Sequence, residues 1–170
     1  MQDAKSHSKL FPFRLSMHIP KNLYAQIVRL MPVPCVDLLV QDETGRMLLI
    51  KRANEPAKGQ WWFPGGRVHF LETREQAAKR KLKEECGLEA LQVKEMGTYD
   101  VILDMPDDAN QSHGITTLFN IGVMKQGDVI LDAQSLDSEW RTLEEWLYEP
   151  LHFFIKQILK AYAKQADETE

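Results

Sequence analysis

The sequence predicts an α+β protein in which helices cover a mixed β-sheet. Strand-like segments stand on both sides of one central helix, residues 73–86, and a second long helical segment spans residues 150–165. Helices with an apolar face need another element to bury it, and a sheet between the helices offers that surface. The order of the elements alone does not fix how the strands are connected.

The first third of the chain predicts a short helix followed by strands. Residues 22–31 follow Pro20 and carry apolar side chains at helical spacing. Residues 35–52 predict a β-hairpin, because two apolar segments flank a turn sequence. Residues 61–63 predict a short strand, and the Pro-Gly-Gly sequence at 64–66 predicts a sharp turn.

The central helix is the clearest element of the chain. Residues 73–86 contain neither Pro nor Gly and consist mainly of helix formers. Gly87 follows at the place where a left-handed cap is expected. Residues 91–103 and 114–123 are strand-like and flank a polar loop, so they predict two further strands.

The last third predicts one strand and two helices. Residues 129–134 have the composition of a strand. Thr142 and Glu145 have the spacing of a capping box, which predicts the start of a helix. Residues 150–165 carry an apolar stripe at helical spacing and predict the last helix.

Length and composition predict one globular domain. Hydrophobic residues at 44% and charged residues at 27% argue against disorder, collagen and a coiled coil. We expect the domain to span residues 21–165, with an N-terminal extension at 1–20 and a polar tail at 166–170. The net charge of -4 gives no strong field for holding a phosphate backbone, so we expect no nucleic-acid partner.

Cysteine usage and hydropathy predict a cytoplasmic protein. Cys35 and Cys86 lie in apolar or helical segments without metal-site spacing, so we expect free thiols in a reducing compartment. No segment approaches the roughly 18 apolar residues of a membrane span. The first residues lack the apolar middle of a signal peptide. We therefore expect no membrane partner.

The glycine-rich loop and the helix after it, residues 64–88, carry the chemistry. Arg80 and Glu84 are four residues apart, as are Lys81 and Glu85, so each pair can meet on the helix surface. A salt-bridged, solvated helix is the simplest interpretation. However, two acids at the end of a helix favour a nearby cation, and the carbonyl oxygen of Gly65 can ligate a hard one.

This stretch resembles the Nudix box, which fixes nine positions over 23 residues. Eight of the nine agree with the pattern, and Lys81 stands where the pattern has a glutamate. The positions are Gly66, Glu72, Arg80, Lys81, Leu82, Glu84, Glu85, Gly87 and Leu88.

The resemblance implies an α/β/α sandwich that cleaves a nucleoside diphosphate linked to another moiety with Mg²⁺ or Mn²⁺. It implies that Glu84 and Glu85 bind the metal together with the Gly65 carbonyl, and that Glu72 and Arg80 brace the loop and the helix. We take Glu84, Glu85 and Arg80 as the predicted catalytic residues. Lys81 removes a negative charge, so either another group activates the attacking water or hydrolysis is weak.

The similarity continues beyond the box. Residues 48–68 and 132–140 resemble the GDP-mannose mannosyl hydrolase branch of the family, in which water attacks the sugar carbon. This resemblance implies a homodimer and a nucleoside diphosphate sugar such as GDP-mannose as substrate. The substrate-binding positions it implies are Asp37, Arg52, Arg67 and Arg80, and the metal ligands are Gly65, Glu85 and Gln134. Arginines suit a diphosphate because their planar fork can bind two oxygens at once.

Three residues depart from that branch. Ser135 replaces its histidine base, Phe119 replaces a phosphate-binding tyrosine, and Glu84 is acidic where the branch has a small neutral residue. A serine without a partner is a poor proton acceptor near pH 7. Attack on phosphorus and attack on the sugar carbon therefore both stay open.

Several other polar or aromatic side chains are weaker candidates. His69 lies near the expected site, and His113 is a possible replacement base. One of the adjacent tryptophans at 61 and 62 is expected in the core, while the other can stack on a base. Acidic side chains that can add an outer metal ligand are Asp104, Asp107 and Asp108.

Two functions follow from this pattern. The first is a divalent-metal-dependent hydrolase of nucleoside diphosphate derivatives. The second is a nucleotide-binding or regulatory protein on the same scaffold, because Lys81 and Ser135 both remove groups that a catalyst can use. The retained pair of Glu84 and Glu85 favours the enzyme.

Overall fold

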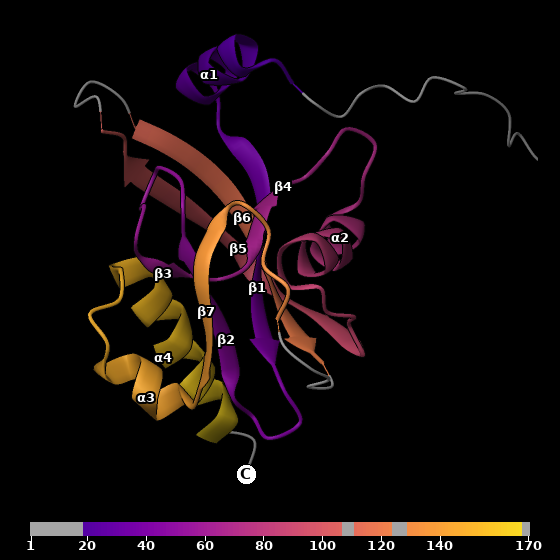
Figure 1. Ribbon diagram of the computed structural model, residues 1–170, viewed down its shortest axis with the longest axis vertical. Helices are drawn as coiled ribbons and strands as arrows, with labels where there is room; N and C mark the ends of the chain where they lie inside the picture. The colour runs from indigo at the N-terminus through magenta and orange to yellow at the C-terminus, as the bar shows by residue number, and fades with distance from the viewer. Residues whose placement is uncertain (1–18, 107–110, 124–128, 168–170) are drawn as a thin grey trace, which may run out of the picture.

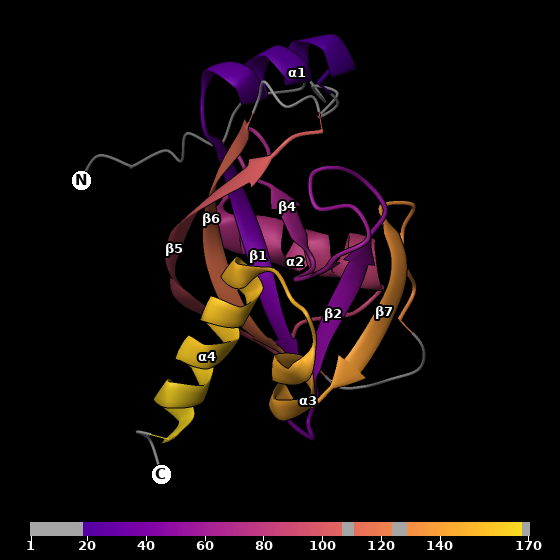
Figure 2. The ribbon, with the colours of Figure 1, turned by 90° about the vertical axis from the view of Figure 1, so that its left-hand side faces the viewer.

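A seven-stranded sheet lies between α2 on one face and α3 with α4 on the other (Figures 1 and 2). The structure, a computed structural model, describes residues 19–106, 111–123 and 129–167. In chain order the elements are α1 (Lys21–Leu30), β1 (Val33–Gln41), β2 (Met47–Arg52), β3 (Trp61–Trp62), β4 (Gly65–Arg67), α2 (Arg74–Cys86), β5 (Gln92–Asp104), β6 (Gln111–Gly122), β7 (Ser135–Arg141), α3 (Leu143–Tyr148) and α4 (Phe153–Asp167). The layers confirm the predicted α+β class and the α/β/α sandwich.

The sheet is mixed, as predicted, and β1 is its central strand. The main path runs β3-β2-β1-β6-β5, while β4 pairs with β1 and β7 pairs with β2. β1 and β6 are parallel, with Val33 opposite Gly114 and Val40 opposite Ile121. The other pairs are antiparallel. Within the described residues, no helix is long and apolar enough to cross a membrane.

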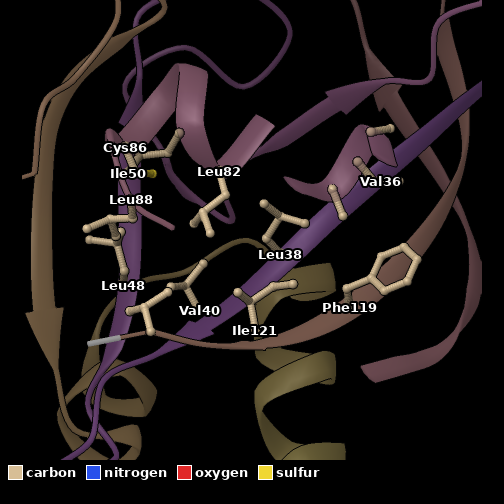
Figure 3. Close-up of a cluster of buried hydrophobic side chains, with 13 residues drawn as sticks. Val36, Leu38, Val40, Leu48, Ile50, Leu82, Cys86, Leu88, Phe119 and Ile121 are labelled. Atoms are coloured by element: carbon tan, nitrogen blue, oxygen red, sulfur yellow. The ribbon is translucent and has the colours of Figure 1, made fainter. Parts of the chain in front are cut away.

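Each face of the sheet has its own apolar core, because successive side chains of a strand point to opposite faces. Figure 3 shows the first core, in which Val36, Leu38 and Val40 of β1 meet Leu82 and Cys86 of α2. The second core lies under α3 and α4 and contains Leu39, Met47, Leu49, Trp62, Phe63, Leu118, Trp146, Phe154, Ile155, Ile158 and Leu159. The first core holds α2 in a fixed place relative to β1.

Both ends of α2 are capped, and the cap at Gly87 is the one that the sequence predicts. Thr73 and Gln76 form a capping box, in which the Thr73 hydroxyl accepts from the Gln76 backbone N–H. Gly87 ends the helix in the left-handed region at φ 69°. α2 therefore begins and ends at fixed residues, which sets the position of its acidic last turn.

Two of the local predictions were wrong. Residues 65–67 do not simply turn but form β4 against β1, and a Cβ on Gly65 would lie 2.3 Å from the Val36 carbonyl oxygen. Glycine thus permits a close approach that the turn interpretation missed. The described residues 129–134 form no strand, because the Asp132 side chain accepts from the Gln134 backbone N–H and makes a turn. β7 begins one residue later, at Ser135.

The N-terminal helix lies beyond one end of the strands (Figures 1 and 2). α1 begins after Pro20 and ends at Leu30, as its sequence predicts, but none of its residues is buried. Its contacts within the described chain are mainly with β6. α1 therefore lies against one end of the sheet and is not part of either core.

Candidate functional site

One cavity of about 810 Å³ brings together all the side chains that the sequence singles out as its main site. Those residues are Asp37, Arg52, Gly65, Arg67, Arg80, Glu84, Glu85 and Gln134. They come from β1, β2, β4, α2 and the segment before β7. The cavity also has Lys81, His69, His113 and Ser135 in its wall.

The two adjacent acids of α2 differ strongly in exposure. The Glu85 side chain is 5% exposed, and its Oε2 accepts from the Gly65 backbone N–H at 2.9 Å. The Lys81 ammonium lies 2.5 Å from the other oxygen, Oε1. Burial raises the pKa of Glu85, and the Lys81 charge opposes that rise. Glu84 is half exposed and accepts from Arg80 Nη1 at 2.9 Å.

Arg80 joins the glycine-rich loop to α2. Its Nε and Nη2 donate to the two oxygens of Glu72 at 2.7 and 2.8 Å, a bidentate pair. Nη2 also donates to the Arg67 carbonyl at 3.0 Å, and Glu72 accepts from the His69 backbone N–H. The bond from Arg80 lowers the pKa of Glu72. These contacts connect the loop to the helix, and a substrate contact of Arg80 stays a prediction.

Asp37 is a buried carboxyl in the wall of the same cavity. It is 7% exposed, and its Oδ2 accepts from the Thr116 hydroxyl at 3.1 Å. Burial raises the pKa of Asp37 to about 7, against the hydrogen bond of Thr116 and the charge of Arg52. Arg52 donates from Nε to the Pro56 carbonyl at 2.8 Å and lies over the ring of Trp62.

Gln134 and Ser135 come from the segment before β7. Gln134 donates its amide nitrogen to Asp132 at 2.9 Å, so its carbonyl oxygen is the atom that can ligate a cation. Ser135 pairs with Arg52 in the sheet. The Ser135 hydroxyl is buried and has no hydrogen-bond partner among the described residues. A buried polar atom of this kind is unusual and costs free energy.

The secondary candidates divide between the cavity and the rest of the molecule. His113 lies in the cavity wall, and its Nε2 is 2.9 Å from Asp100 Oδ1. His69 also lines the cavity, where burial lowers its pKa. Phe119 instead packs in the first core, and Asp104 accepts from Gln111 outside the cavity lining.

The two adjacent tryptophans both pack against the second core. Trp62 is buried, stacks on Phe154 and forms part of the cavity wall. Trp61 meets Trp146 edge to face. Of the pair, Trp62 is therefore the one with access to a ligand. The remaining acidic candidates, Asp107 and Asp108, lie outside the described residues.

The donor set fits a hard divalent cation that keeps part of its shell for water and substrate. Among the described residues no three His, Cys, Asp or Glu side chains gather into a complete cage. Glu84 and Glu85, with the oxygens of Gly65 and Gln134, provide two carboxylates and two neutral ligands on one cavity. Mg²⁺ is commonly bound by one or two carboxylates plus substrate phosphates.

The sequence interpretation missed three residues that contribute to the site. Thr116 holds Asp37 from the neighbouring strand β6, although the two residues are 79 positions apart. Asp132 holds Gln134, and its spacing of two residues before the glutamine was an available signal. Tyr24 of α1 lines the cavity and lies under the Arg67 guanidinium at 5.5 Å. No local pattern marks Thr116 or Tyr24.

Comparison with protein families matches residues 31–162 to the NUDIX domain. The chain is 32% identical to the low-salt glycan biosynthesis protein Agl8 of Haloferax volcanii over 84% of this chain and 90% of that one. It is 35% identical to an ADP-ribose pyrophosphatase of Methanocaldococcus jannaschii over 75% and 76%.

Solved structures share the same fold. A MutT protein from Methanosarcina mazei Go1 has a TM-score of 0.66 at 22% identity, covering 81% of this chain and 97% of that one. The NUDIX domain of Shewanella oneidensis NrtR, solved with ADP ribose, also has a TM-score of 0.66 at 22% identity, covering 87% and 99%. At this identity the likeness concerns the fold.

Proposed function

The chain belongs to the Nudix hydrolase family, and we propose that it hydrolyses a nucleoside diphosphate linked to a sugar with the help of Mg²⁺ or Mn²⁺. The observation that carries this proposal is the single cavity that holds Glu84 and Glu85 together with Arg52 and Arg67. Carboxylates for a cation and guanidinium groups for phosphate oxygens are the two requirements of diphosphate cleavage.

The names of two relatives support a substrate of this class. One relative is an ADP-ribose pyrophosphatase, and ADP-ribose is a nucleoside diphosphate joined to a sugar. Another is a glycan biosynthesis protein. We therefore propose a sugar nucleotide as the substrate and GDP-mannose as the first compound to test. The protein is proposed to act in the cytoplasm as a homodimer, and sedimentation of the purified chain tests the dimer.

In the proposed mechanism one set of residues binds the ion and the substrate, and another set holds the first in position. Glu84, Glu85, the Gly65 carbonyl and Gln134 would hold the divalent ion, which supplies charge neutralisation at the diphosphate and a more acidic bound water. Arg52 and Arg67 would bind phosphate oxygens. Arg80 is held by Glu72, so it keeps the loop and α2 at a constant separation.

Asp37 would accept from a substrate hydroxyl deep in the cavity. Its other partner, Thr116, fixes the carboxyl from β6. We favour attack of water on phosphorus over attack on the sugar carbon. This choice rests on Ser135, which lies in the cavity wall where the sugar-carbon branch has a histidine base, and whose hydroxyl has no hydrogen-bond partner among the described residues.

A panel of nucleoside diphosphate sugars, assayed with and without Mg²⁺, tests the proposal. Glu85→Gln should lower kcat/KM by at least roughly 100-fold, because it removes a charged ligand from a buried position. Glu75→Gln is the matched control, since Glu75 lies on the same helix but is exposed and pairs with Lys79. Unchanged turnover in Glu85→Gln would show that this carboxylate is not an essential ligand.

A second candidate is a protein that binds nucleotides on this scaffold with little catalysis. The contact between Lys81 and Glu85 favours it, because an ammonium competes for a predicted metal ligand. This candidate predicts sugar-nucleotide binding in calorimetry without Mg²⁺-stimulated hydrolysis. Metal-stimulated turnover of any compound in the panel would exclude it.

A further inference from the structure

We propose that Lys81 is a built-in cation of the metal site, which takes the place of a second divalent ion and leaves the site with room and charge for one. The inference rests on the proposed function, because it assumes that Glu84 and Glu85 bind a metal. We infer that Lys81 determines how many ions bind and how tightly, and that it takes no part in the chemical step.

The first support is the position of the ammonium. Lys81 Nζ lies 2.5 Å from Glu85 Oε1 and 3.8 Å from Glu84 Oε2, so it contacts both predicted metal ligands. A second divalent ion beside these two carboxylates would need the space that the ammonium fills. The ammonium therefore stands in for that second ion, and it carries half the charge.

The second support is burial. The Lys81 side chain is only 8% exposed, and its partner Glu85 is buried as well. An unpaired charge in such a place is very costly, so each group requires the other or a replacement ion. Lys79, two residues earlier on α2, is 54% exposed and pairs with Glu75 at the surface. Of these two lysines, only Lys81 lines the cavity.

The third support is the glycine loop that makes room for the lysine. A Cβ on Gly66 would lie 2.8 Å from Lys81 Cε and 3.3 Å from its Nζ. Gly66 also has a φ of +146°, which L side chains rarely adopt. The loop that provides the Gly65 carbonyl therefore packs directly on the lysine. The glycine-rich loop, Lys81 and the two glutamates therefore pack together as one unit.

Charge then sets the number of ions. Glu84, Glu85 and the Lys81 ammonium leave a single net negative charge at the acidic end of the cavity. Arg80, which also contacts Glu84, adds no net charge because Glu72 is its bidentate partner. One divalent ion already overcompensates the single negative charge, and a second would meet strong repulsion in a partly buried site. A glutamate at position 81 would reverse the balance and supply a third carboxylate.

Mn²⁺ titration of the metal-free protein, followed by electron paramagnetic resonance and calorimetry, tests the inference without using turnover. The wild-type chain should bind one Mn²⁺ at the site. Lys81→Glu should bind two, and Lys81→Met should bind the first ion roughly 10-fold more tightly because the competing ammonium is gone. Lys79→Glu is the matched control and should bind like wild type.

Two Mn²⁺ ions in the wild-type site would overturn the inference, whether or not the variants fold. Unchanged affinity in a folded Lys81→Met protein would also overturn it, with circular dichroism reporting the fold. These failures differ from failure of the proposed function, which would appear as absence of hydrolysis across the sugar-nucleotide panel. One bound ion without turnover would leave Lys81 in its assigned role.

Discussion

At the scale of the residue, burial of the Asp37 carboxyl in the cavity wall makes the stability of the fold depend on pH. The group is 7% exposed and is surrounded by Thr116, Arg52 and Glu85. Burial raises its pKa to about 7, from 3.8 for an ordinary aspartate. Below both values the carboxyl is protonated in the folded and unfolded chains. Between them the unfolded chain loses the proton first, so stability falls as the pH rises.

Asp37→Asn should remove this pH dependence, because an amide does not ionise yet still accepts from Thr116. Relative to wild type, the metal-free variant should gain roughly 2–4 kcal/mol of unfolding free energy between pH 4 and pH 7, and the gain should level off above pH 7. Urea unfolding at several pH values measures the difference. A difference that stays constant over this range would contradict the assigned burial cost.

At the scale of the element, the C-terminal cap of α2 connects two parts of the site. Gly87 is left-handed at φ 69°, and a Cβ there would lie 3.0 Å from Ile130 Cβ. The Ile130 backbone N–H also donates to the Cys86 carbonyl at 3.0 Å. The segment that carries Gln134 is thereby attached to the end of the helix that carries Glu84 and Glu85. The cap positions both sets of predicted ligands.

Gly87→Ala should lower the unfolding free energy by about 1–2 kcal/mol, through backbone strain and the contact with Ile130. Gly45→Ala is the matched control, because Gly45 has a similar φ of +80° but nothing within 4 Å of an added Cβ. It should cost less. Chemical denaturation of the two variants makes the comparison, and equal losses would mean that the contact with Ile130 adds nothing.

The same scale shows what the sequence could predict. Fixed spacing along one helix and loop was enough to place α2, its C-terminal cap and the acidic pair, because local geometry determines them. It could not place β4, whose glycines gain their meaning only beside β1. It also could not connect Thr116 to Asp37, since the parallel pairing of β1 with β6 is a long-range contact. Local sequence patterns therefore predict the Nudix box, whereas β4 and the contact between Thr116 and Asp37 depend on the sheet topology.

At the scale of the whole molecule, the packing of α3 on the sheet is separate from the cavity. Trp146 of α3 is fully buried, and its indole N–H donates to the Met47 carbonyl of β2 at 2.9 Å. Its ring also meets Trp61 and lies under Arg141. It is absent from the lining of the large cavity. Trp146 therefore holds α3 on the sheet and does not line the cavity of the candidate site.

Trp146→Phe should reduce the unfolding free energy by about 1–3 kcal/mol, because the Met47 carbonyl loses a donor and the smaller ring leaves space. Activity per folded molecule should stay within about twofold of wild type, since the cavity wall is unchanged. Thermal melts and steady-state kinetics on one preparation test both statements. A large loss of kcat in folded protein would show that the two faces are coupled.

We propose that the protein hydrolyses a sugar nucleotide with a divalent metal by attack of water on phosphorus. Hydrolysis of the panel in ¹⁸O-labelled water, with products identified by mass spectrometry, tests this most directly. We expect Mg²⁺-dependent cleavage with the label in a phosphate-containing product. Label in the free sugar would contradict the proposed point of attack, and no hydrolysis of any nucleotide with either metal would contradict the enzyme itself.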